Sequence, residues 1–203
     1  MRKVLAEVSE SKMEILFDRP AIDRRVRELA LEISGDYAGG ELLVIGILKG
    51  AFVFMADLVR SLTIPCRIDF MRAASYGDAQ ESSGRITIIK DTELSVRNCD
   101  VLVVDDIVDT GLTLDYIAQE LKSRGARSLK VCAFLDKRKR RKVPFEADYV
   151  GFTIDDGFVI GYGLDYAEKY RFLPEVYVLT RKSGKVEKTD DHTMQAVPDE
   201  IPL

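Results

Sequence analysis

Residues 101–114 carry the side chains whose types and spacing are best suited to chemistry in this chain. The segment reads VLVVDDIVDTGLTL, so an apolar run ends in Asp105 and Asp106 before a turn that contains Gly111. Such a run is typical of a parallel strand covered on both faces, and ligands of open α/β sheets bind where these strands end. Gly111 permits a bend that directs successive amides at one point, and the start of a helix adds positive potential. We therefore expect residues 109–113 to hold a phosphate group.

The composition limits which other groups could take part. The single histidine, His192, lies in a polar segment, and there is no tryptophan. Histidine-dependent catalysis and His-ligated metals are therefore not expected. The three cysteines, Cys66, Cys99 and Cys132, are odd in number and widely spaced among apolar residues. This pattern predicts buried structural thiols in a reducing compartment, and it leaves carboxylates, lysines and backbone amides as the chemical groups.

Alternating helix and strand patterns predict the elements that position these groups. Asp18 and Pro20 begin a helix whose apolar residues follow a 3.6-residue period, and Gly35 is its expected end. The other expected helices are residues 51–62 and 114–121, and the expected strands are residues 42–47, 68–70, 86–89, 101–104, 131–135, 149–154 and 176–179. A polar loop at residues 74–85 and a turn at residues 105–113 complete the pattern. Strands that alternate with helices imply an α/β fold with a parallel sheet.

Length and charge indicate one domain of ordinary size. Of the 203 residues, we expect residues 1–181 to form a single domain and the polar residues 182–203 to form a disordered tail. No apolar run approaches the ~18 residues of a membrane helix, and no secretory signal follows Met1, so we expect a cytoplasmic protein. A net charge of -4 gives no global attraction to nucleic acid, although residues 137–142 (KRKRRK) form a local basic run.

The 101–114 segment resembles the signature of the type I phosphoribosyltransferases, which bind 5-phosphoribosyl 1-pyrophosphate. The resemblance implies a parallel twisted sheet flanked by helices, with a small hood formed by the N- and C-terminal segments. It also implies that Asp105 and Asp106 hold the ribose hydroxyls, directly or through magnesium, a hard cation that prefers carboxylates and substrate oxygens. The residues that would bind the 5′-phosphate are Asp109, Thr110, Gly111, Leu112 and Thr113.

Three further segments resemble the hypoxanthine-guanine branch of this family. Lys49 and Gly50 match a loop that wraps the pyrophosphate, often after a non-proline cis peptide bond before the lysine. Asp109 would face N7 of the incoming base and act as general acid/base. The lid loop that closes over the reaction centre and excludes water would be Ser75, Tyr76 and Gly77.

A C-terminal block resembles the base-binding part of the 6-oxopurine enzymes. The resemblance implies that Lys137 donates to O6 of the base, that Phe158 stacks on its ring and that the Val159 carbonyl accepts from its nitrogens. Asp165 would bind a second magnesium ion, and Arg171 would contact the pyrophosphate. The implied enzyme is a magnesium-dependent hypoxanthine-guanine phosphoribosyltransferase of purine salvage, which makes IMP or GMP and releases pyrophosphate. We expect it to be a homo-oligomer, either a dimer or a tetramer.

Three positions depart from the family pattern, and two alternatives follow. Asp155 stands where proline is common, Gly157 where a longer side chain is usual, and Asp105 where glutamate is frequent. The preference among hypoxanthine, guanine and xanthine therefore stays open. One alternative is a regulator of the same fold that senses nucleotide and binds RNA through residues 137–142. The other is an enzyme for xanthine, uracil or adenine, although Asp109 favours a purine because uracil-directed relatives commonly lack it.

Overall fold

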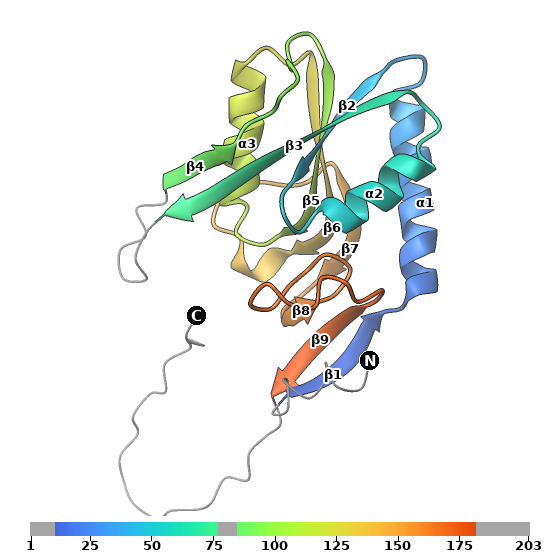
Figure 1. Cartoon of the computed structure of the whole chain (residues 1–203), viewed down its shortest axis with the longest axis vertical. Coiled ribbons are helices and arrows are strands. Elements are labelled where there is room, and N and C mark those ends of the chain that lie inside the picture. Colours follow the sequence, from blue (N-terminus) through green and yellow to red (C-terminus); the bar gives the residue numbers. More distant parts are fainter. Residues whose placement is uncertain (1–10, 77–84, 182–203) are drawn as a thin grey trace, which may run out of the picture.

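The computed structural model describes residues 11–76 and 85–181. Figure 1 shows a main sheet with helices on both of its faces and a smaller sheet beside it. In chain order the elements are β1 (Ser11–Phe17), α1 (Arg19–Asp36), β2 (Leu42–Ile47), α2 (Phe52–Ser61), β3 (Cys66–Tyr76), β4 (Arg85–Lys90), β5 (Asp100–Val108), α3 (Leu112–Ser123), β6 (Ser128–Lys137), the 3-10 helix η2 (Arg138–Arg140), β7 (Tyr149–Ile154), β8 (Phe158–Ile160) and β9 (Val176–Arg181).

The six-stranded main sheet has the strand order β4-β3-β2-β5-β6-β7. The expected parallel pairing is confirmed for β3, β2, β5, β6 and β7. The edge strand β4 differs, because it runs antiparallel to β3. Only residues 77–84 connect these two strands, and a parallel crossover needs a dozen residues or more. The short connection therefore dictates the antiparallel edge.

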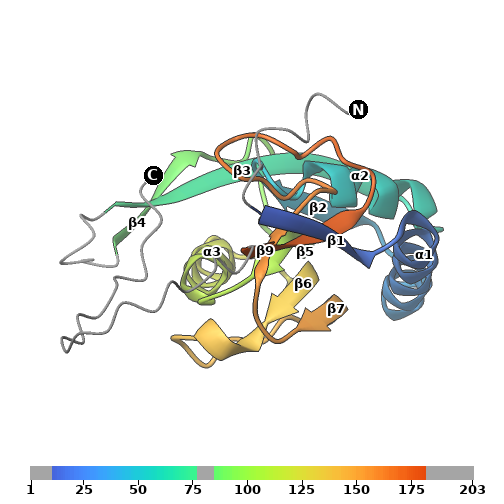
Figure 2. The same ribbon diagram turned by 90° about the horizontal axis from the view of Figure 1, so that it is seen from below.

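The continuous apolar runs of β2 and β5 are explained by two separate cores. Val44 and Leu102 belong to the cluster that packs against α1 and α2. Their neighbours Ile45 and Val103 belong to the cluster that packs against α3 on the opposite face. Figure 2 shows α3 and the α1–α2 pair on the two sides of the sheet. Successive residues of a strand point to opposite faces, so both faces must be apolar here.

Helix α1 begins as its sequence predicts and ends slightly later. The Asp18 carboxylate accepts a hydrogen bond from the backbone N–H of Ala21 (2.9 Å), which caps the helix, and Pro20 lies in the first turn. The expected end at Gly35 is wrong by one residue, because the helix includes Asp36. Gly35 keeps a helical backbone. The glycine that adopts a left-handed backbone conformation after this helix is Gly39, with φ of +79°.

The small sheet joins the two ends of the described chain. Its order is β1-β9-β8 and its pairs are antiparallel, so the hood of N- and C-terminal segments is confirmed. The sequence did not predict β1 or β8 as strands. β1 leaves Ile15 55% exposed and so lacks a clean apolar face, and β8 is a strand of only three residues.

The three thiols lie in different environments. Cys132 is buried, as expected, whereas Cys66 and Cys99 are partly exposed, so the expectation of three buried thiols is wrong for these two. Cys66 lies at the start of β3, and Cys99 lies just before β5. None of the helices in residues 11–76 and 85–181 is long and apolar enough to cross a membrane.

Candidate active site

Asp105 and Asp106 lie inside strand β5 and not in the turn that the sequence predicted. The ladder between β5 and β6 continues past them, with Asp105 opposite Ala133 and Val108 opposite Asp136. These hydrogen bonds extend the strand by four residues beyond its apolar run. The two carboxyl groups are therefore fixed by the sheet, at the carboxyl end where ligands of such sheets bind.

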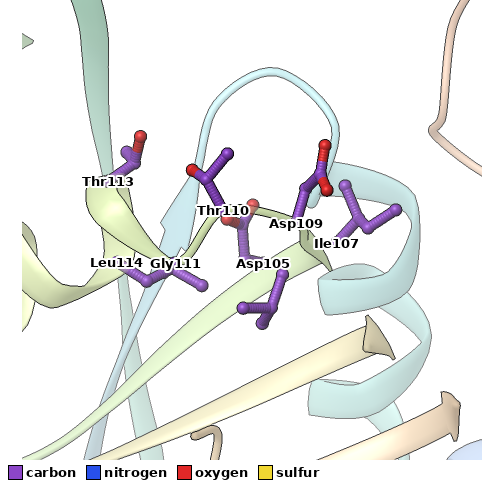
Figure 3. Close-up of a pocket in the computed structure, with 8 residues that line it drawn as sticks. Asp105, Ile107, Asp109, Thr110, Gly111, Thr113 and Leu114 are labelled. Atoms are coloured by element: carbon purple, nitrogen blue, oxygen red, sulfur yellow. The ribbon is translucent and has the colours of Figure 1, made fainter. Parts of the chain in front are cut away.

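The turn after β5, where the sequence predicts a phosphate-binding cradle, bends at Gly111 and lines a pocket. Gly111 has φ of +82°, a left-handed conformation that glycine adopts without strain, and α3 begins at the next residue. The N–H of Leu112 donates to the Thr110 hydroxyl oxygen (3.4 Å). Figure 3 shows Asp109, Thr110 and Thr113 projecting from this turn. A pocket of about 150 Å³ is lined by Asp105, Ile107, Val108, Asp109, Thr110, Gly111, Thr113 and Leu114.

The carboxyl groups of Asp105 and Asp106 accept hydrogen bonds from backbone N–H groups, and their burial disfavours negative charge. The Asp106 N–H donates to Asp105 Oδ1 (3.0 Å), and the Ile107 N–H donates to Asp106 Oδ1 (3.1 Å). Burial raises the pKa of both carboxyl groups, and the adjacent charge of Asp106 raises the pKa of Asp105 further. A cation or a set of hydroxyl donors placed here would relieve that cost.

The pair suits a metal only in combination with other oxygen ligands. Among the described residues, no group of three or more His, Cys, Asp or Glu side chains could hold a metal ion. Magnesium commonly binds through one or two carboxylates plus substrate phosphates. Asp105 and Asp106 therefore fit a magnesium ion that is also bound by the substrate.

The Lys49–Gly50 loop approaches the acid pair closely. The Leu48–Lys49 peptide bond is cis, as the resemblance implied. A Cβ atom on Gly50 would lie 1.7 Å from Asp106 Oδ2, and a Cβ atom on Gly163 would lie 2.3 Å from the Gly50 carbonyl oxygen. Side chains at these two positions are therefore excluded, and the loop, the end of β5 and a hood turn meet there.

Ionic contacts join the loop to the hood. Lys49 Nζ lies 2.9 Å from Glu168 Oε2, and Arg171 Nη2 lies 3.4 Å from the same oxygen. Arg171 also contacts Asp165 Oδ1 (2.8 Å) and donates to the Gly163 carbonyl (2.7 Å). Both cations that were expected to bind pyrophosphate thus share one carboxylate, that of Glu168. Asp165, expected to bind a metal, already accepts from Arg171 and from the Glu168 N–H (2.9 Å).

A second pocket brings the expected base-binding residues together. It has a volume of about 200 Å³ and is lined by Asp106, Ile107, Asp109, Lys137, Arg140, Gly157, Phe158, Val159, Leu164 and Asp165. Phe158 is 44% exposed and so is not a core residue. Its ring packs edge-on against Tyr166, with centroids 5.4 Å apart. Lys137 lies at the end of β6, is buried, and donates to the Gly157 carbonyl (3.1 Å).

The glycine at position 157 suits its own backbone. Its φ is +114°, a conformation that side chains other than glycine rarely adopt. A Cβ atom there would lie 3.2 Å from Val178. Glycine at position 157 therefore suits the local turn, which orients the Gly157 carbonyl that accepts from Lys137.

Asp109 lies in the walls of both pockets. Its Oδ1 atom is buried and has no hydrogen-bond partner within the described residues. Its Oδ2 atom lies 3.2 Å from Arg140 Nη1. Its backbone carbonyl accepts a hydrogen bond from Arg141 Nε (3.2 Å). Asp109 thus lines both the pocket after β5 and the pocket that contains Phe158.

Known proteins are similar to this chain over most of its length. A family profile described as "Phosphoribosyl transferase domain" matches residues 12–167. The chain belongs to the phosphoribosyltransferase family. It is 47% identical over 176 residues to the hypoxanthine-guanine phosphoribosyltransferase of Aquifex aeolicus. The alignment covers 86% of this chain and 99% of that protein. It is also 45% identical over 166 residues to the Bacillus subtilis enzyme of the same name, in an alignment that covers 82% of this chain and 92% of that enzyme.

A solved structure supports the same assignment. The hypoxanthine phosphoribosyltransferase of Staphylococcus aureus superposes with a TM-score of 0.82 at 43% identity, covering 89% of this chain and 96% of that one. These comparisons confirm the predicted phosphoribosyltransferase fold, its hypoxanthine-guanine branch and its transferase class.

The lid segment of this phosphoribosyltransferase is only partly described. Ser75 and Tyr76 end strand β3, opposite Ile86 and Arg85 of β4. The polar loop expected at residues 74–85 is therefore shorter than predicted, because its first three residues and its last one pair as strands. Gly77 lies outside the described residues.

Sequence reasoning missed three residues of the candidate site. Arg140 and Arg141 were assigned only to the local basic run at residues 137–142, but both contact Asp109. Arg141 also binds the Phe145 carbonyl and the Asp136 carboxylate. Glu168 was not considered, and only its place three residues before Arg171 could have indicated the contact.

Proposed function

We propose that this chain transfers the 5-phosphoribosyl group of 5-phosphoribosyl 1-pyrophosphate to N9 of hypoxanthine or guanine. The products are IMP or GMP and pyrophosphate. The observation that carries the proposal is the position of Asp109, which lines the cradle after β5 and the pocket of Phe158 at once. A sugar phosphate in the first site and a planar base in the second would meet beside this carboxylate.

The cradle would bind the phosphoribosyl donor. Backbone amides of residues 109–113 and the hydroxyls of Thr110 and Thr113 would hold the 5′-phosphate at the start of α3, where the helix dipole favours an anion. The carboxylates of Asp105 and Asp106 would hold the ribose hydroxyls. Lys49 and Arg171 would bind pyrophosphate, which would take the place of the Glu168 carboxylate between them.

The base would be recognised by the second pocket. Phe158 would stack on the purine ring, Lys137 would donate to O6, and the Val159 carbonyl would accept from ring or exocyclic nitrogens. The accessible carboxylate of Asp109 would accept the proton that N7 loses as N9 bonds to the ribose carbon. The bond between that carbon and pyrophosphate breaks in the same step, and its electron pair leaves with pyrophosphate.

Magnesium is the proposed cofactor. Asp105 and Asp106 would hold it together with ribose and pyrophosphate oxygens, and Asp165 would bind a second ion once Arg171 turns toward pyrophosphate. When bound, magnesium neutralises charge that develops on the leaving pyrophosphate. The lid residues Ser75, Tyr76 and Gly77 would exclude water from the reaction centre.

The proposal extends to the whole chain. Residues 1–181 would form one catalytic domain with its hood, and residues 182–203, for which the sequence predicts a disordered tail, lie outside the described residues. The protein would act in the cytoplasm as a homo-oligomer, a dimer or tetramer. Exposed aromatic side chains on α2 (Phe52, 46% exposed) and in the hood (Phe172, 67% exposed) are consistent with such contacts.

The test is release of pyrophosphate from 5-phosphoribosyl 1-pyrophosphate, with magnesium, across a panel of free bases. Hypoxanthine and guanine should support pyrophosphate release, and adenine and uracil should give no release above background. The amount released with xanthine would show the preference among the three 6-oxopurines. Tight binding of the donor without turnover on any base would identify a nucleotide sensor instead. Release with uracil or adenine as the best substrate would reassign the base.

A further inference from the structure

The basic run at residues 137–142 is divided among different surroundings. Lys137 is buried at the end of β6. Of the three η2 residues that follow, Arg140 is the one that lines the base pocket. Arg138 turns away to Asp136 (2.9 Å). A charged guanidinium group therefore stands at the entrance to a pocket that is expected to take a neutral base.

Arg140 occupies the accessible part of the Asp109 carboxylate. Asp109 Oδ1 is buried, so Oδ2 is the oxygen that a molecule in the pocket can reach, and Arg140 Nη1 lies 3.2 Å from it. Because a purine nitrogen would need that same oxygen, Arg140 and the base compete for it. The Arg140 side chain is 62% exposed, so it can leave without unpacking the core.

The backbone around Arg140 is anchored, so only its side chain needs to move. Arg141 holds the Asp109 carbonyl (3.2 Å) and also contacts the Phe145 carbonyl and the Asp136 carboxylate. The Lys142 N–H donates to the Thr110 carbonyl (2.9 Å). The segment therefore stays against the cradle while the Arg140 side chain is free to turn outward.

We propose that Arg140 is a latch that pairs with Asp109 while the base pocket is empty and turns outward when the base enters. The proposal rests on the proposed role of Asp109 as the group that faces the base. Arg140 is a positioning residue here, since it acts through Asp109. The latch weakens base binding and keeps the carboxylate neutralised until the base replaces the guanidinium group. An exposed ion pair of this kind changes an equilibrium constant by up to about fivefold.

The test compares Arg140→Gln with Lys139→Gln, which removes the same charge from the same turn. With the phosphoribosyl donor saturating, Arg140→Gln should lower the KM for hypoxanthine about threefold to fivefold. It should leave the KM for the donor unchanged. Lys139→Gln should leave both constants unchanged, and Arg140→Lys should keep the wild-type KM for the base.

Two further measurements separate a latch from a general charge effect. Hypoxanthine is neutral, so in the wild type its KM should fall as salt rises from about 20 to 200 mM, because salt screens the Arg140–Asp109 pair. In Arg140→Gln this dependence should vanish. In an Asp109→Asn background, Arg140→Gln should have no further effect on the KM for the base.

The contrary results are distinct. A KM for hypoxanthine that rises in Arg140→Gln, or that changes equally in Lys139→Gln, would overturn the latch while leaving the transferase intact. Absence of pyrophosphate release in the wild type itself would overturn the proposed function, and the latch with it.

Discussion

Asp109 owes its proposed role to the surroundings of its carbonyl and of its two carboxylate oxygens. Its carbonyl is fixed by Arg141, one carboxylate oxygen is buried without a partner in the described part of the chain, and the other faces the base pocket. The backbone that forms the phosphate cradle does not depend on its charge, because Gly111 and the start of α3 supply the amides. Proton transfer and donor binding should therefore be separable at this residue.

We expect Asp109→Asn to lower kcat about a hundredfold or more, since positioned acid/base groups commonly contribute that much. The KM for the phosphoribosyl donor should stay within about threefold, because asparagine keeps the shape of the turn. Steady-state kinetics would measure both. Asp115→Asn is the matched control, because this carboxylate lies on α3 and contacts Gln119 (2.8 Å) outside both pockets. A wild-type kcat in Asp109→Asn would remove the assigned role.

The Asp105–Asp106 pair predicts a pH dependence of stability. The folded-state pKa of Asp105 is raised by burial and by Asp106. Its protonated form is therefore favoured by folding, and the stability that this gives at low pH is lost as pH rises through the raised pKa. Asparagine at this position stays neutral throughout.

Without donor or magnesium, we expect the wild type to lose unfolding free energy relative to Asp105→Asn as pH rises above the ordinary pKa of an aspartate, because the pKa of Asp105 is raised in the folded state. Denaturant unfolding across a series of pH values measures this difference. If both proteins change in parallel, the raised pKa of Asp105 is wrong.

At the scale of elements, the site depends on three backbone segments that touch. Gly50 lies against Asp106 of β5, and Gly163 of the hood lies against the Gly50 carbonyl. The sequence indicates the Lys49–Gly50 loop, but the need for glycine at position 163 follows from this approach and from its φ of +100°. Loop, strand end and hood must keep their relative positions for the cations Lys49 and Arg171 to reach one ligand.

We therefore expect Gly50→Ala to lower kcat/KM for the phosphoribosyl donor at least tenfold and to destabilise the fold by about 2 kcal/mol, because its Cβ overlaps Asp106 Oδ2. Gly35→Ala is the control, since nothing lies within 4 Å of a Cβ atom there. That change should stabilise helix α1 by roughly 0.5–1 kcal/mol. Kinetics and thermal unfolding test both, and a fully active Gly50→Ala protein would contradict the close approach.

Periodicity predicted the elements of the main sheet because burial on two faces leaves a clear apolar pattern. It placed α1, β2, α3 and β7 within a few residues of their bounds. It ended β5 too early, because hydrogen bonds to β6 extend a strand beyond its apolar residues and polar side chains do not reveal them. Strand β1 was missed because tertiary pairing with β9, not its own pattern, makes it a strand.

The site was predicted to the extent that its residues are close in sequence. The turn at residues 109–113 follows from one glycine and a strand before it, and the pocket of Phe158 and Lys137 was grouped by resemblance. Two contacts join residues that are far apart in the sequence. Arg140 contacts Asp109 about thirty residues away, and Glu168 contacts Lys49 more than a hundred residues away. A run of charged residues and a single glutamate are ordinary surface features, so the sequence did not indicate that Arg140 and Glu168 contact the candidate site.

At the scale of the whole molecule, the hood and the main sheet enclose the site from two directions. The buried Tyr162 of the hood donates to Asp57 of α2 (2.8 Å), and Asp57 also pairs with Arg19 of α1 (3.0 Å). The hood is therefore tied to the helices on one face of the sheet, next to the Lys49–Gly50 loop. Figure 1 shows β8 and β9 lying beyond the ends of the central strands. Phe158 of β8 and Asp109 after β5 therefore line one pocket.

The most direct test of the central claim is a calorimetric titration of the wild-type protein with 5-phosphoribosyl 1-pyrophosphate, with and without magnesium. The end of β5 holds two carboxyl groups with raised pKa beside the pocket that we propose for the 5′-phosphate. Magnesium bound by these carboxyl groups and by substrate oxygens would favour binding of the charged sugar phosphate. We predict binding at one site per chain, at least tenfold tighter with magnesium than with a chelator. No binding, or equal affinity in both conditions, would contradict the assignment of this site.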